Sequence, residues 1–208
     1  MKSSRIFLIH IILLSVIFFP LALLLNNLNE PGKILYPLRN WTQLIWYLLF
    51  FIYIFSFSNS RKQVLKNFNY KKLLSIRVWI TILVVLLFMI LSIRFIISID
   101  PFADFMAKYS AANGEQLMDI VIGLAPLQMI LSIILIGPIF EEIYFRELLV
   151  GQLGKVIPLW LSIIISSIIF GFVFHGGYPI WVTINGLVLA FLYVSTKSWS
   201  VPLMVHVL

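Results

Sequence analysis

Three of the eight carboxylates in this 208-residue sequence lie in one short apolar stretch, "GPIFEEIYFREL". They are Glu141, Glu142 and Glu147, and Arg146 lies among them. The surrounding residues are apolar or aromatic, as in a segment that crosses a membrane. A charged side chain near the centre of such a segment costs roughly 2.5 to 3.5 kcal/mol, so we expect a buried functional cluster with compensating partners. The alternative is a helix end whose charges lie among the lipid headgroups.

The spacing of these residues separates their roles. On a helix, Glu142 and Arg146 are four residues apart and share a face, so the guanidinium is expected to neutralise this carboxylate through charge-assisted hydrogen bonds. Glu141 points about 100° away from Glu142. Arg146 is therefore not expected to pair with Glu141, and Glu141 is the carboxylate predicted to activate water. The spacing gives no role to Glu147.

Two histidines in later apolar segments are candidate partners of Glu141. His175 ends "LSIIISSIIFGFVFH", and His206 lies in "SWSVPLMVHVL". Glu141 lies 17 residues before Pro158 and His175 lies 17 after it, so an antiparallel hairpin about this proline brings both side chains to a similar depth. His206 follows the turn at Ser198 by eight residues, or about 12 Å of helix, which puts it in the same half of the bilayer. The alternative for each histidine is a packing role.

A carboxylate beside histidines in a water-poor site can activate water in two ways, and both lead to hydrolysis. In the first, Glu141 is the general base and the histidines stabilise an oxyanion, with no cofactor required. In the second, histidines and a glutamate bind a divalent metal such as zinc, which acidifies a bound water. The sequence has no His-Glu-x-x-His pattern, so the metal question stays open. It has no cysteine, which excludes thiolate chemistry and disulfides.

The elements that must hold these residues are membrane helices. The chain is 62% hydrophobic and 11% charged, which is far from the composition of a soluble domain. We therefore predict an all-α, polytopic transmembrane helix bundle that forms a single membrane domain over residues 1–208. About seven spans are expected, the last cut short, over residues 6–25, 41–57, 78–99, 118–149, 156–174, 180–195 and from 199 onward.

The charges between the spans predict the orientation of the bundle. The segment from residue 60 to 77 carries six basic residues and no acidic one, whereas the loop from 100 to 119 carries four acidic residues and one lysine. The positive-inside rule then places the first segment and the N-terminus in the cytoplasm, in a multi-pass protein of the cell membrane. The net charge of +7 is a topology signal in this interpretation, and no nucleic-acid partner is predicted.

In these motifs the sequence resembles the CAAX prenyl protease and bacteriocin-processing (CPBP, or Abi) family of intramembrane proteases. "EEIYFR" matches the Glu-Glu-x-x-x-Arg motif of the family, and "SSIIFGFVFH" and "LMVH" follow in the order and spacing of its second and third motifs. The resemblance covers about residues 131–208, within a predicted catalytic core of residues 118–208. Residues 1–117 match only as generic membrane helices.

The resemblance implies a peptidase that cuts peptide bonds at or within the membrane. By this comparison Glu141 activates water, Glu142 and Arg146 are its supporting pair, and His175 and His206 are the catalytic histidines. The resemblance thus implies these five site residues, and it does not decide whether a metal ion takes part.

The sequence departs from the family pattern at two places. The residue four positions before His175 is Gly171 instead of the usual phenylalanine, although Phe170 and Phe172 flank it and a shifted aromatic ring can still wall the pocket. The third motif normally has Asn or Asp four positions after its histidine, whereas this chain stops at Leu208. We expect the native chain to continue past this residue; the alternative is that the protein lacks this polar partner and that its oxyanion site is incomplete.

The predicted function is therefore that of an intramembrane endopeptidase, with a role in bacteriocin processing or self-immunity as its finer form. Its expected partners are the lipid bilayer and a membrane-associated protein or leader peptide as substrate. The alternative is a catalytically inert membrane scaffold or immunity protein. A proton-coupled transporter ranks last, because the chain shows none of the duplicated halves that are usual in transporters.

Overall fold

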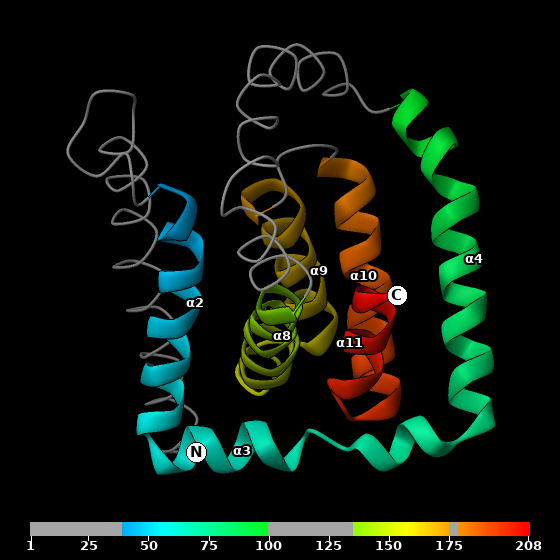
Figure 1. Ribbon diagram of the computed structural model, residues 1–208. Helices are drawn as coiled ribbons and strands as arrows, with labels where there is room; N and C mark the ends of the chain where they lie inside the picture. Colours follow the sequence, from blue (N-terminus) through cyan, green and yellow to red (C-terminus); the bar gives the residue numbers. More distant parts are fainter. Residues whose placement is uncertain (1–38, 100–134, 175–178) are drawn as a thin grey trace.

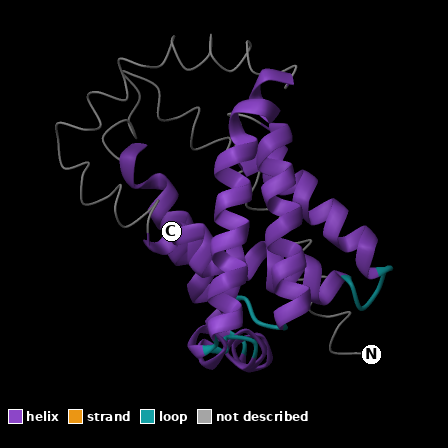
Figure 2. Ribbon diagram, turned by 90° about the vertical axis from the view of Figure 1, so that its right-hand side faces the viewer, coloured by secondary structure: helices purple, strands orange, loops and turns teal. Residues whose placement is uncertain are grey.

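The computed structural model describes residues 39–99, 135–174 and 179–208. Within these ranges every regular element is a helix and none is a strand (Figure 2). The elements are α2 (Arg39–Ser56), α3 (Ser58–Lys66), η2 (Tyr70–Leu74), α4 (Ile76–Ile99), α8 (Gly137–Glu141), η4 (Glu142–Leu153), α9 (Leu159–Ile169), η5 (Phe170–Phe174), α10 (Pro179–Thr196) and α11 (Ser200–Val207). The all-α class is confirmed for this part of the chain.

The predicted spans coincide with helices wherever the structure describes them. Helices α2, α4 and α10 match their predicted spans within two residues at each end. Judged by length and composition, α10 is the one described helix that can cross a membrane by itself, and a second span results if the bent pair Leu44–Ser56 and Ser58–Leu74 is counted as one. A membrane bundle fits these helices, but the predicted number of seven spans is not confirmed. The span predicted at residues 6–25 lies outside the described residues.

The helices form a group with one segment crossing its end (Figure 1). Helices α2 and α4 stand on either side, and α8, η4, α9, α10 and α11 lie between them. Residues 58–74 cross one end of this group, and their direction differs from that of residues 44–56 by 103°. The sequence predicts no membrane span here, only a basic segment between two spans, and the structure shows that this segment is helical in α3 and η2. Ser60 and Val64, one helical turn apart, are buried on the inner face of α3.

Hydrogen bonds fix the crossing segment to the turn that precedes α11. Trp199 Nε1 donates to the carbonyl oxygen of Val64 at 2.9 Å, and the Trp199 amide donates to that of Asn67 at 3.2 Å. Ser198 Oγ donates to the same Asn67 oxygen at 3.0 Å and accepts from the Asn69 amide at 3.0 Å. The crossing segment is thus an integral part of the folded body.

Helices η4 and α9 form the antiparallel hairpin that was predicted about Pro158. This proline is the N-cap of α9, a position where the missing amide proton carries no penalty. Two hydroxyl groups join the helices: Ser166 Oγ donates to the carbonyl oxygen of Phe145 at 3.0 Å, and Ser162 Oγ donates to that of Val150 at 3.4 Å. The hairpin holds the carboxylate cluster against α9.

Helices α9 and α10 approach closely at Gly186. A Cβ on this residue would lie 3.1 Å from Ser167 Cα and 3.2 Å from Phe170 Cδ1. Small residues permit such close packing of membrane helices. Gly186→Leu is therefore expected to destabilise the protein by about 1–3 kcal/mol, seen as a lower midpoint of thermal unfolding in detergent. Phe191→Leu, at a side chain that is 63% exposed, should leave the midpoint unchanged, and equal midpoints for both variants would contradict the prediction.

Candidate active site

The carboxylate cluster lies where helix α8 continues into η4, which is a π-helix. Ten of the 12 residues of η4 are buried, and four of these ten are polar or charged. The cluster itself, Glu141, Glu142, Arg146 and Glu147, is at most 6% exposed. Because η4 continues to Leu153, the cluster is a buried group and does not mark a helix end, in agreement with the favoured prediction. π-Helical turns are frequent at functional sites.

The predicted pair of Glu142 and Arg146 is present. Arg146 Nε lies 3.3 Å from Glu142 Oε2, and both side chains are buried. The pair lacks the alignment of a hydrogen bond, and the other two guanidinium nitrogens have no hydrogen-bond partner in the described part of the chain. The guanidinium instead lies over the Phe170 ring, 4.7 Å from its centroid, where a cation–π contact stabilises the charge.

His206 joins the two adjacent glutamates. Its Nε2 lies 3.3 Å from Glu141 Oε2, and its Nδ1 lies 3.1 Å from Glu142 Oε1. The His206 ring also packs against the Phe170 ring in an edge-to-face arrangement, with the ring centroids 6.0 Å apart and the ring planes at 83°. The C-terminal helix α11 therefore brings the predicted histidine to the predicted carboxylates across 64 residues of sequence.

This arrangement suits proton transfer. An imidazole can donate a hydrogen bond to two carboxylates at once only when both of its nitrogens carry protons. When the ring of His206 carries one proton, its other nitrogen can only accept a hydrogen bond, and the donor on that side must be a protonated carboxyl group. Glu141, Glu142 and His206 thus form a buried group that can share and redistribute protons, which is the requirement for general acid–base chemistry.

Glu147, for which the sequence gave no role, is the centre of a polar network. Its side chain is fully buried. It accepts hydrogen bonds from Asn67 Nδ2 at 3.0 and 2.8 Å, Tyr193 Oη at 3.0 Å, Gln63 Nε2 at 3.2 Å and Gln152 Nε2 at 3.2 Å. These donors come from α3 and its C-cap, from α10 and from η4 itself. Glu147 therefore joins the helix of the candidate site to the crossing segment.

Two other sequence predictions concern the second motif. His175 lies outside the described residues, so its predicted meeting with Glu141 stays a prediction. Gly171 is packed so tightly that a Cβ would collide with Thr183 Oγ1 and lie 2.6 Å from the carbonyl oxygen of Pro179. A phenylalanine does not fit there. Phe170, which is 3% exposed and contacts both Arg146 and His206, supplies the aromatic wall instead.

A metal ion needs several His, Cys, Asp or Glu side chains gathered around one point. Across residues 39–99, 135–174 and 179–208, no group of three or more His, Cys, Asp or Glu side chains is placed to hold one. His206 and the two glutamates that it contacts engage one another. The described donors by themselves do not form a metal site.

Comparisons with known proteins point to one family. Residues 123–208 match the model of a family described as "Rce1-like: Type II CAAX prenyl endopeptidase Rce1-like". A protein of Bacillus subtilis (strain 168) named "Putative membrane peptidase YdiL" is 39% identical over 98 residues, which make up 46% of this chain and 39% of that relative. The chain thus spans less than half the length of this curated relative. No solved structure matches the chain significantly.

The matched segment is the one that holds the site. It contains Glu141, Glu142, Arg146 and His206, which meet at one place in the fold. The resemblance of the C-terminal part of this chain to the CAAX prenyl protease and bacteriocin-processing family is therefore confirmed.

Proposed function

We propose that this protein is an intramembrane endopeptidase that hydrolyses peptide bonds through a glutamate-activated water. One observation carries the proposal: His206 contacts both Glu141 and Glu142, at 3.3 and 3.1 Å, in a buried cluster. The matched family and the name of the relative both support a CAAX-type intramembrane protease in general terms. Buried carboxylates that touch a histidine are suited to moving the protons of a hydrolysis.

In the proposed reaction, Glu141 removes a proton from a water molecule as the oxygen of that water attacks the carbonyl carbon of the peptide bond. As Glu141 takes up this proton, the N–H at Nε2 of His206 is proposed to turn from Glu141 to the oxyanion that forms, while Nδ1 stays on Glu142. His175, predicted from the sequence, is proposed to donate a second hydrogen bond to the oxyanion. The proton on Glu141 then passes to the amide nitrogen as the carbon–nitrogen bond breaks. The products are a carboxylic acid and an amine, and Glu141 returns to its initial state.

The remaining cluster residues have positioning roles in this proposal. Glu142 holds Nδ1 of His206, so the imidazole keeps its orientation and presents Nε2 towards Glu141. Arg146 supplies the positive charge that compensates buried Glu142. This arrangement resembles the support that an orienting carboxylate gives to a catalytic histidine in other hydrolases.

The substrate class follows from the membrane setting. We propose a membrane-associated protein or a leader peptide, with bacteriocin processing or self-immunity as the finer role. Mass spectrometry of protein termini can test this in membranes from cells that express the wild type or Glu141→Gln. New termini are expected with the wild type only. Identical termini in both would favour the alternative of an inert scaffold or immunity protein.

Metal removal tests the mechanism. Cleavage by the protein reconstituted in liposomes is expected to survive exhaustive chelation, because Glu141 is proposed to activate water without a metal. The measurement is the initial cleavage rate before and after chelation, with a zinc-dependent peptidase treated in parallel to show that chelation is complete. A loss of activity that added zinc restores would overturn the proposed mechanism and favour the metal-bound alternative.

A further inference from the structure

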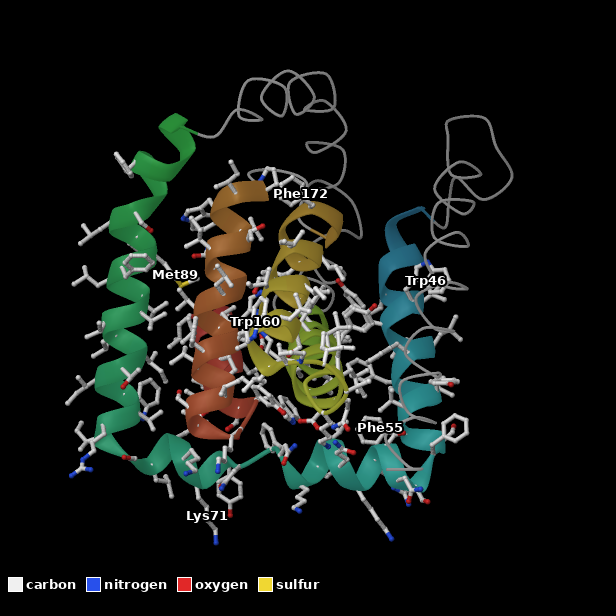
Figure 3. All side chains as sticks on the ribbon, turned by 180° about the vertical axis from the view of Figure 1, so that it is seen from behind. Trp46, Phe55, Lys71, Met89, Trp160 and Phe172 are labelled. Carbon is white, nitrogen blue, oxygen red and sulfur yellow. The ribbon has the colours of Figure 1, made fainter. Side chains whose placement is uncertain are left out.

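A basic surface lies on the outside of residues 58–77, the segment that crosses the end of the bundle. Its six cationic side chains are all exposed: Arg61, Lys62, Lys66, Lys71, Lys72 and Arg77. The segment contains no acidic residue, so none of these charges is neutralised from within it. Lys71 points away from the bundle (Figure 3). Such a concentration of like charge attracts an anionic partner.

The inner face of the same segment is fixed, so the basic surface is preformed. Asn67 Nδ2 binds both oxygens of buried Glu147, and Gln63 Nε2 binds one of them. Val64 is fully buried, and its carbonyl oxygen accepts a hydrogen bond from Trp199 Nε1. A surface that is already ordered loses little conformational entropy when it binds a partner. In this respect the segment differs from a charged loop that is only loosely attached to the fold.

Exposed apolar side chains are interleaved with the charges. Their exposed fractions range from 38% to 79%, at Leu65, Phe68, Tyr70, Leu74 and Ile76. Basic groups beside apolar ones, on a segment that runs nearly at right angles to α2, match the boundary between headgroups and acyl chains. An acidic peptide would pair with the cations but would leave these apolar groups in water. The combination therefore favours lipid over an acidic protein.

We infer that residues 58–77 form a binding surface for the headgroups of anionic phospholipids in the cytoplasmic leaflet. The phosphate groups pair with the lysines and arginines, while the apolar side chains contact the upper acyl chains. This inference goes beyond the proposed peptidase and does not depend on it, because no residue of the carboxylate–histidine cluster takes part. Basic clusters next to a membrane span are a recognised mode of attraction to anionic lipid.

Native mass spectrometry of the full chain tests the inference. The protein is released from nanodiscs that contain equal amounts of phosphatidylglycerol and phosphatidylcholine, and the lipids that stay bound are identified. The wild type should retain phosphatidylglycerol preferentially. Replacing Lys62, Lys66 and Lys71 by glutamine should lower this preference by about fivefold for each charge removed.

Two sets of variants serve as controls. Arginine at the same three positions keeps the charge and should keep the preference. Asn59→Gln changes an exposed, uncharged side chain of the same segment and should also keep it. Equal retention of both lipids by the wild type, or glutamine variants that behave like the arginine variants, would show the inference to be wrong. It would also be wrong if an acidic peptide, oligoglutamate, bound in phosphatidylcholine nanodiscs while phosphatidylglycerol gave no preference.

Discussion

Glu141→Gln should lower the rate of peptide cleavage by about 10²- to 10⁴-fold, the usual contribution of general acid–base catalysis. Glutamine has nearly the same size as glutamate, so its side chain can keep the contact with His206 Nε2 at 3.3 Å. An amide cannot accept a proton from water at neutral pH, so the attack on the carbonyl carbon is lost. The loss should appear in kcat with little change in KM, because the interaction removed acts in the transition state.

The measurement compares initial rates in proteoliposomes for a peptide identified by terminal analysis. Glu147→Gln is the matched control, since Glu147 is also a buried glutamate but accepts its hydrogen bonds from Asn67, Tyr193 and other donors away from His206. It should retain cleavage per folded molecule. A wild-type rate in Glu141→Gln would sink the hydrolase interpretation. An equal loss in both variants, with both folds intact, would mean that Glu141 has no special role.

Much of the cluster could be predicted because its members are close in sequence or confined by the membrane. The pairing of Glu142 with Arg146 follows from a spacing of four residues within one helix, and the structure contains it. His206 could be placed because a membrane helix has a fixed rise, so its distance from the turn at Ser198 gives its depth. The contact of His206 with both glutamates could not be predicted in this way, since depth does not determine which way a helix turns its face.

The role of Glu147 could not be predicted from local spacing. Its partners Gln63 and Asn67 lie 84 and 80 residues earlier in the chain, in a segment that the sequence analysis used only to predict orientation. Tyr193 lies 46 residues later. A contact between such distant residues depends on how the helices pack, which a single sequence without internal repeats does not show. One signal was available: a carboxylate in an apolar segment requires partners, and the polar amides of α3 were the unassigned donors.

The π-helical winding of η4 was also missed. The predicted angle of about 100° between Glu141 and Glu142 holds for 3.6 residues per turn, whereas residues 142–153 are wound more widely. Side chains separated by four or five residues then share a face. Arg146 and Glu147 can both lie near the direction of Glu142 and yet reach different partners, Glu142 and Asn67. No pattern in the apolar residues of this segment distinguishes the two windings.

Glu147→Leu should destabilise the fold by about 3 kcal/mol. The substitution keeps a buried side chain of similar length but removes the acceptor of Asn67, Tyr193, Gln63 and Gln152. A buried donor left without a partner costs about 1–3 kcal/mol, and Tyr193 and Asn67 make the shortest of these bonds. The measurement is the midpoint of thermal unfolding in detergent, together with the rate of tryptic cleavage after the lysines of α3, which should rise as this helix detaches.

A double substitution tests whether the network is the cause. Asn67→Leu combined with Glu147→Leu removes a donor together with its acceptor, so the pair should be less destabilising than the sum of the single changes by about 0.5–3 kcal/mol. Additive effects, or an unchanged midpoint in Glu147→Leu, would contradict the network. The molecules of Glu147→Leu that remain folded should still cleave peptide, because His206 and Glu141 keep their contact. Glu147→Leu would then lower stability and Glu141→Gln would lower the cleavage rate, so that two nearby glutamates have different roles.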